Sequence, residues 1–231
     1  MEKDDITHEE NKEDISEVKD KKEEAQNSVN ANSKEQIKSD NQILTKVFIG
    51  IGAFVLLVVL FMVLINAINH FEYRGINFNV VKDTGGLIFY NTAFPMYSSG
   101  KHVADYNVYL RTDPRALESV PFDGEIKFSP IPKLVYNSTG EFNCNGDGVI
   151  AVANFAQIFG ALGIQVIKDE NATCDSQGRY MLLNIQPGNE TNIKQVGPTC
   201  YELYVNNCEI LDITEKFIVE SLSKINEIKE N

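Results

Sequence analysis

Histidine and the familiar glycine-rich phosphate loops are scarce in this sequence. Its three histidines, His8, His70 and His102, cannot assemble a multi-histidine metal site within one chain. A serine triad would have to use His102, and no G-x-S-x-G motif supports one. The glycine pairs match neither a Walker A motif nor a dinucleotide fingerprint. The sequence therefore gives no support to a zinc enzyme, a serine hydrolase or a nucleotide-binding fold, and no cofactor is expected.

Basic residues are too few to make a positively charged protein. The formal net charge is −12, of which residues 1–46 carry −5, from 8 Lys against 13 acidic residues, and the rest of the chain carries −7. Neither part offers a basic surface to a phosphate backbone. We therefore expect no nucleic-acid partner.

Cysteine is limited to four residues, and none forms a C-x-x-C pair, which argues against a zinc ribbon or a dithiol redox centre. Two structural disulfides are expected, with three possible pairings. If Asn206 and Asn207 form a two-residue hairpin turn, Cys208 faces Val205 and cannot easily reach Cys200. Each of these two cysteines would then bond to one of the other two. The disulfide candidates are Cys144, Cys174, Cys200 and Cys208.

One uncharged, mostly apolar stretch, residues 47–69, is the strongest signal in the chain. A bilayer core needs about 20 such residues in a helix, so we expect a transmembrane helix over residues 46–69. The stretch starts too late for a secretory signal and lacks a small-residue cleavage site after it, which indicates an uncleaved signal anchor. Residues 1–45 have no aromatic residue and few apolar ones, which predicts a disordered acidic tail.

The residues on either side of the span predict its orientation. Lys34, Lys38 and Lys46 precede it, whereas Arg74 and Lys82 are the basic residues that follow closely, a weak positive-inside bias. All four cysteines and all three N-x-S/T sequons follow the span. We expect a single-pass cell-membrane glycoprotein with a cytoplasmic N-terminus and an extracytoplasmic domain over residues 70–231. The glycosylation candidates are Asn137, Asn171 and Asn189.

The extracytoplasmic domain is expected to be α+β with a mixed sheet and a possible subdivision near residue 130. Its first half is β-rich, and a short helical turn follows Pro114. A helix over residues 147–162 lies between two strands, which suggests a βαβ unit. A final amphipathic helix is expected to start at Asp212, with Glu215 at the capping-box position, and to close the domain. The expected strands are residues 76–80, 87–94, 103–110, 125–128, 133–137, 164–168, 179–186 and 200–205.

The segment from Asn143 to Ile150 looks like the start of an EF-hand calcium loop. Asn143, Asn145 and Asp147 stand at loop positions 1, 3 and 5, but Asp147 is the only carboxylate, which makes this a weak calcium candidate. The alternative is that Asp147 caps the following helix after an Asn-Gly turn. Cys144 precedes that helix, whose dipole would lower the pKa of a free thiol.

Three segments carry a family resemblance: residues 71–78 (FEYRGINF), 109–115 (YLRTDPR) and 200–210 (CYELYVNNCEI). Together they resemble a group of single-span membrane proteins from small-genome archaea that has no assigned activity. The resemblance covers most of residues 70–220 and not the acidic tail. It implies a cell-surface setting in which sequons are glycosylated and cysteines are bridged, and it implies no mechanism.

These observations lead to one preferred function and two alternatives. The preferred one is a membrane-anchored extracytoplasmic binding or scaffolding protein whose partner is a cell-surface protein or polysaccharide. The first alternative is an extracytoplasmic enzyme or thiol-redox protein that uses Cys144 or a pair of carboxylates. The second is a calcium-stabilised adhesion module.

Overall fold

The computed structural model describes residues 44–98 and 100–230. The chain divides into two compact units, Met1–Leu64 and Ile65–Asn231, and each is described by itself. The tail expected over residues 1–45 lies outside the described residues except for Leu44 and Thr45.

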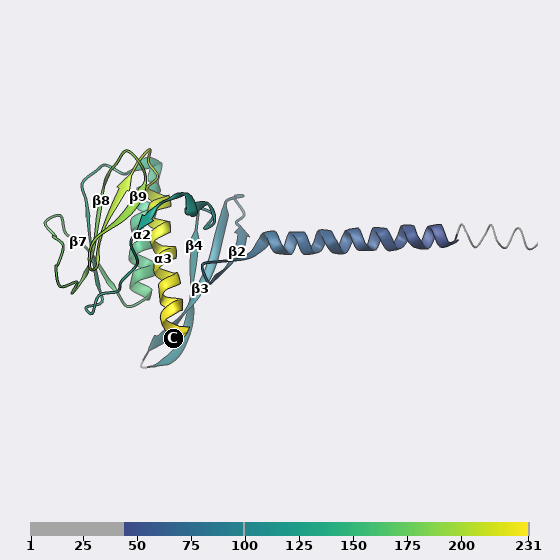
Figure 1. Cartoon of the computed structure of the whole chain (residues 1–231), viewed down its shortest axis with the longest axis horizontal. Coiled ribbons are helices and arrows are strands. Elements are labelled where there is room, and N and C mark those ends of the chain that lie inside the picture. The colour runs from purple at the N-terminus through teal and green to yellow at the C-terminus, as the bar shows by residue number, and fades with distance from the viewer. Residues whose placement is uncertain (1–43, 99, 231) are drawn as a thin grey trace, which may run out of the picture. The chain divides into compact units, whose positions relative to one another are not determined.

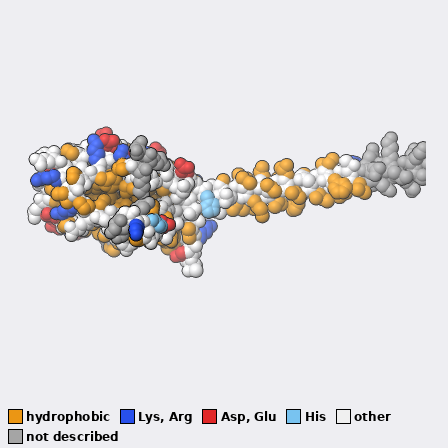
Figure 2. All heavy atoms as spheres, turned by 90° about the horizontal axis from the view of Figure 1, so that it is seen from below, with side chains coloured by type: hydrophobic (Ala, Val, Ile, Leu, Met, Phe, Trp, Pro, Cys, Tyr) orange, Lys and Arg blue, Asp and Glu red, His pale blue; other side chains and the backbone are white. Residues whose placement is uncertain are grey.

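A single helix, Leu44–Asn69, accounts for the apolar stretch. Its 26 residues have a mean hydropathy of 3.2, and its apolar side chains point outward along its length (Figure 2). At a rise of about 1.5 Å per residue, it is long enough to cross the hydrocarbon core of a bilayer. It begins two residues before the expected start at residue 46.

The first four strands of the domain form an antiparallel sheet in the order β1-β2-β3-β4 (Figure 1). β1 was not expected from the sequence. It joins β2 through Arg74 and Gly75, which both have positive φ angles, +53° and +73°. A two-residue turn of this kind matches the twist of the strands that it connects. The bounds are β1 His70–Tyr73, β2 Ile76–Lys82, β3 Ile88–Ser98 and β4 Lys101–Leu110.

The remaining strands form a six-stranded mixed sheet in the order β5-β9-β10-β8-β6-β7. β6 and β7 are parallel and are connected through helix α2, which confirms the βαβ unit. β9, which was not expected from the sequence, pairs antiparallel with β10. The bounds are β5 Phe122–Asp123, β6 Lys133–Ser138, α2 Asp147–Ala161, β7 Gln165–Lys168, β8 Met181–Pro187, β9 Asn192–Gly197 and β10 Cys200–Val205.

The strand expected over residues 125–128 is wrong. Gly124, at φ +132°, turns the chain after β5, and a Cβ there would lie 2.4 Å from Cβ of Gln195. After Gly124 the backbone forms hydrogen bonds with a side chain and not with a neighbouring strand. Tyr201 Oη accepts a 2.8 Å hydrogen bond from the Lys127 amide and donates a 3.0 Å bond to the Glu125 carbonyl.

Two helices complete the core. α2 packs against the C-terminal helix α3, Ile210–Glu230, and Phe155 of α2 and Phe217 of α3 lie 5.9 Å apart between ring centroids. Ile218 and Leu222 of α3 are buried and Ile225 is partly buried, so the expected apolar stripe does close the domain. The ring of Tyr201 in β10 packs edge-on against the ring of Phe217, so this contact joins the six-stranded sheet to α3.

The capping box expected at Asp212 is wrong, because α3 begins at Ile210. Glu215 is fully buried and accepts 2.8 Å hydrogen bonds from the amides of Arg111 and Thr112, just after β4. Thr112 Oγ1 also donates a 2.6 Å bond to Asp212 Oδ1. The two acids therefore fasten the end of β4 to α3 instead of capping their own helix.

Candidate functional site

The four cysteines form two disulfides, Cys144–Cys208 and Cys174–Cys200. The premise of a hairpin at residues 206–207 is wrong, because β10 leads into α3 and not into another strand. Cys200 and Cys208 nevertheless bond to different partners, as that premise had indicated. Cys144 has no free thiol in this structure, so it offers no nucleophile.

The calcium candidate lies in the turn before α2. Asn143 accepts backbone hydrogen bonds from Gly146 and Gly148 through its carbonyl, and Asn145 has a positive φ of 59°. Asp147 is the first residue of α2, and Arg111 Nη1 lies 3.3 Å from its carboxylate. Within the described residues, no group of three or more His, Cys, Asp or Glu side chains is placed to hold a metal ion. Calcium binding here stays a prediction from the sequence.

The three sequons lie in different surroundings. Asn171 and Asn189 are exposed in loops, before β8 and before β9. Asn137 is partly buried in β6, opposite Asn184 of β8. Their glycosylation stays a prediction.

One cavity of the domain is a charged groove of about 520 Å³. One wall is α3, and the other is the chain from the short helix Ala116–Ser119 through β5 to Ile126. The turn between β1 and β2 closes one part of it. We call it the α3 groove, and its charged residues are Arg74, Glu118, Glu125, Lys216, Glu220, Lys224 and Glu227.

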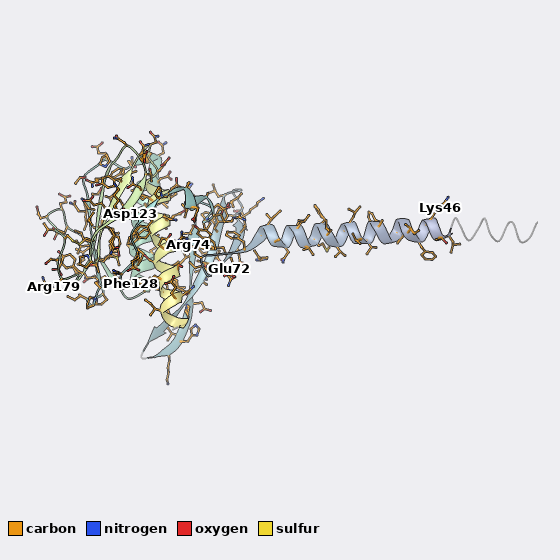
Figure 3. The ribbon with its side chains drawn as sticks, viewed as in Figure 1. Lys46, Glu72, Arg74, Asp123, Phe128 and Arg179 are labelled. Carbon is orange, nitrogen blue, oxygen red and sulfur yellow. A yellow bond between two sulfur atoms is a disulfide. The ribbon has the colours of Figure 1, made fainter. Side chains whose placement is uncertain are left out.

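Arg74, labelled in Figure 3, makes two of the ionic contacts in the α3 groove. Its Nη1 donates a 2.7 Å hydrogen bond to Glu220 Oε2, and its Nη2 lies 3.5 Å from Glu118 Oε2. Its carbonyl accepts a 2.9 Å bond from Ser223 Oγ. A positive φ is uncommon for an arginine, and such positions persist where surrounding contacts over-determine them. Here the bonds to α3 supply those contacts.

Lys216 is the buried cation of the groove. It is 2% exposed, and its Nζ lies 3.1 Å from Glu220 Oε1. Glu220 therefore stands between two cations, Lys216 on one oxygen and Arg74 on the other. Since an ammonium has three N–H donors, Lys216 keeps donor capacity on the groove side of this pair.

The acids at the rim are held ionised. A hydrogen bond from the Tyr73 hydroxyl lowers the pKa of Glu118, and a hydrogen bond from Lys127 lowers the pKa of Glu125. Lys224 Nζ lies 2.9 Å from Glu227 Oε2. The α3 groove thus presents charges of both signs at neutral pH.

Sequence reasoning missed this site. Its residues run from position 74 to position 227, and only the α3 residues share a local spacing. The Arg74-Gly75 pair, at a turn between strands, was the available signal. A positive φ at Arg74 could not be inferred without first placing β1.

No family model, curated protein or solved structure matches this chain.

Proposed function

We propose that this chain is a single-pass membrane protein whose N-terminal segment is cytoplasmic and whose disulfide-bonded domain binds a partner outside the cell. The helix Leu44–Asn69 is long and apolar enough to serve as the anchor. Both disulfides follow it in the chain, and disulfides persist in oxidising compartments. The proposal includes the uncleaved signal anchor, the glycosylated sequons and membership of the archaeal single-span group.

The partner that fits the α3 groove is a polypeptide segment carrying both charges. The observation that carries this proposal is the chain of ionic contacts from Lys216 through Glu220 to Arg74, with acids on the rim. Cations on the floor can bind a partner's carboxylates, while Glu118 and Glu227 can bind its lysines or arginines. A neutral polysaccharide has no charged groups to pair with either the cations or the acids of the groove.

Binding is a better fit than catalysis. The groove holds no histidine and no cysteine, and Glu118 and Glu125 have lowered pKa values, whereas a general acid at neutral pH needs a raised one. Glu220, the acid nearest its floor, is engaged with both Arg74 and Lys216. These features favour a site that recognises charge and leaves its ligand unchanged.

The groove can be tested with a photo-crosslinking residue at Glu227 in the full-length protein, in membranes of its host. A matched control carries the same residue at Val196, which is exposed on β9 and does not line the groove. We expect a discrete polypeptide adduct from position 227 that is lost in a variant combining Glu118→Gln with Lys224→Gln. The same adducts from both positions, or an adduct with a sugar polymer, would contradict the proposal.

The orientation can be tested separately by protease treatment of intact host cells. Protease added to intact cells should degrade the domain and leave a fragment containing residues 1–69. Protection of the domain in intact cells, with digestion only after lysis, would reverse the proposed topology.

A further inference from the structure

Exposed apolar side chains gather at one end of the four-stranded sheet. Outside the helix Leu44–Asn69, some exposed large apolar residues, such as Ile131, Val196 and Ile228, lie singly on the surface, which is ordinary for a folded domain, and Val149 and Val152 lie one turn apart on α2. Four others lie together where β2 ends, where β3 begins and beside the end of β4. We call this group the hairpin patch, and its residues are Val81, Leu87, Ile88 and Tyr109.

On one face of the sheet the hairpin patch runs across three strands, whereas Ile88, which pairs with Lys82, points to the opposite face at the same end of the sheet. Val81 of β2 pairs with Phe89 of β3, so their side chains share a face. Phe89 packs edge-on against Tyr109 of β4, with 6.4 Å between ring centroids. Leu87, in the connecting loop, is 51% exposed. Clustered apolar and aromatic residues of this kind mark an interaction surface.

The strand register places the hairpin patch at the end of the sheet where the chain arrives from the apolar helix. Asn69 ends that helix and His70 begins β1, with no residue between them. His70 pairs with Asn79, and Val81 lies two residues, about 7 Å, further along β2 in the direction from which β1 comes. The patch and the covalent junction with the helix are therefore at one end of the same sheet.

The loop that carries Leu87 is suited to a surface poor in water, because it satisfies its own backbone. Asp83 donates a 3.0 Å amide hydrogen bond to the Leu87 carbonyl, and its carbonyl accepts a 3.1 Å bond from the Gly86 amide. Its carboxylate accepts bonds from the amides of Gly85 and Leu87. Unpaired backbone groups are the main cost of placing a loop against lipid, and this loop has few.

We propose that the hairpin patch lies in the lipid headgroup region and holds the domain against the bilayer that the helix crosses. Apolar residues with an aromatic residue beside them are typical of interfacial segments, and Lys82 can reach lipid phosphates. The inference rests on the proposed membrane span. It adds a second contact with the membrane, from a part of the domain separate from the α3 groove.

The chain contains no tryptophan, so one substitution makes a unique fluorescent reporter. Full-length protein with Leu87→Trp would be reconstituted into vesicles of zwitterionic phospholipid with and without brominated acyl chains. The matched control is Val103→Trp, a 59% exposed position on β4, six residues and about 20 Å along the strand from Tyr109. Ile88→Trp gives a second reporter in the patch, and Leu57→Trp reports insertion of the helix.

We expect brominated lipid to quench Leu87→Trp and Ile88→Trp at least twofold more than Val103→Trp, with a blue-shifted emission for both patch reporters. Equal quenching at positions 87 and 103, with Leu57→Trp strongly quenched, would overturn the inference and leave the span intact. A blue-shifted but unquenched Leu87→Trp would indicate that protein covers the patch, which also overturns it. An unquenched Leu57→Trp would overturn both the span and this inference.

Discussion

Arg74 Nη1 and Glu220 Oε2 lie 2.7 Å apart although the two residues are separated by 146 positions in the sequence. The bond connects the first turn of the domain to its last helix. Glu220 also neutralises the buried Lys216, so the same carboxylate contributes both to the stability of the domain and to the charge of the α3 groove.

Replacing Glu220 with glutamine should destabilise the protein. Lys216 would remain buried without its counter-charge, and breaking a largely buried pair from one side costs about 3 kcal/mol of unfolding free energy. The measurement is denaturant unfolding of the full-length protein in detergent. Glu170→Gln is the control, since the Lys168–Glu170 pair is exposed and its loss should cost under about 1 kcal/mol. Equal effects would mean that Lys216 does not depend on Glu220.

Glu215 should make stability depend on pH. Burial raises its pKa in the folded protein from 4.5 to about 7. Between these values the unfolded chain has released the proton while the folded protein retains it, so the unfolding free energy falls as pH rises, by about 3 kcal/mol in total. The contribution of the protonated Glu215 to stability is therefore fully present below pH 4.5 and is lost as the pH rises through about 7.

The matched variant is Glu215→Gln, which keeps a carbonyl oxygen for one of the two amides and cannot titrate. Unfolding free energies measured from pH 4.5 to 7.5 should fall more steeply for the natural sequence than for the variant. Parallel pH profiles would show that Glu215 ionises alike in the folded and unfolded states.

The two disulfides should contribute unequally. Cys144–Cys208 closes a loop of 64 positions and Cys174–Cys200 one of 26. The chain-entropy relation gives about 4 kcal/mol for the longer loop and about 3.5 kcal/mol for the shorter one. Double Cys→Ala variants at each pair, compared by denaturant unfolding, check the size of both effects. Cys200 is also buried, so its replacement adds a packing cost that Cys208 lacks.

Glycans should be found at Asn171 and Asn189 more often than at Asn137. The first two are exposed in loops, whereas Asn137 is partly buried within β6. Peptide mapping of protein secreted through a glycosylating route gives the occupancy of each site. Single Asn→Gln changes serve as controls, and highest occupancy at Asn137 would contradict the prediction.

Local patterns predicted the elements that are stabilised locally. The apolar helix, the βαβ unit around α2 and the buried stripe of α3 each have a periodicity visible within their own residues. β1 has only four residues and directly follows the apolar helix. So short a strand shows too little alternation of apolar and polar residues to be told apart from the helix before it. Glu215 matched a capping box because sequence spacing cannot reveal the distant amides of Arg111 and Thr112.

The candidate site was less predictable than the fold, for the same physical reason. Arg74, Glu118 and Lys216 meet only because two sheets and α3 bring them together. The sequence predicted that the four cysteines form two disulfides, but which cysteines pair depends on the path of the chain between Cys144 and Cys208. Such long-range contacts leave no mark in local composition.

The attachment of the turn between β1 and β2 to α3 bears on how the protein is made. Ser223 and Asn226 donate hydrogen bonds to the carbonyls of Arg74 and Gly75, across 149 and 151 positions. During synthesis the first hairpin of the domain must therefore wait for nearly the whole domain to be made before α3 is available to bind it. Contacts this distant in sequence slow folding and prolong the exposure of apolar surface. Chains that stop before Ser223 should accumulate as substrates for proteases and chaperones.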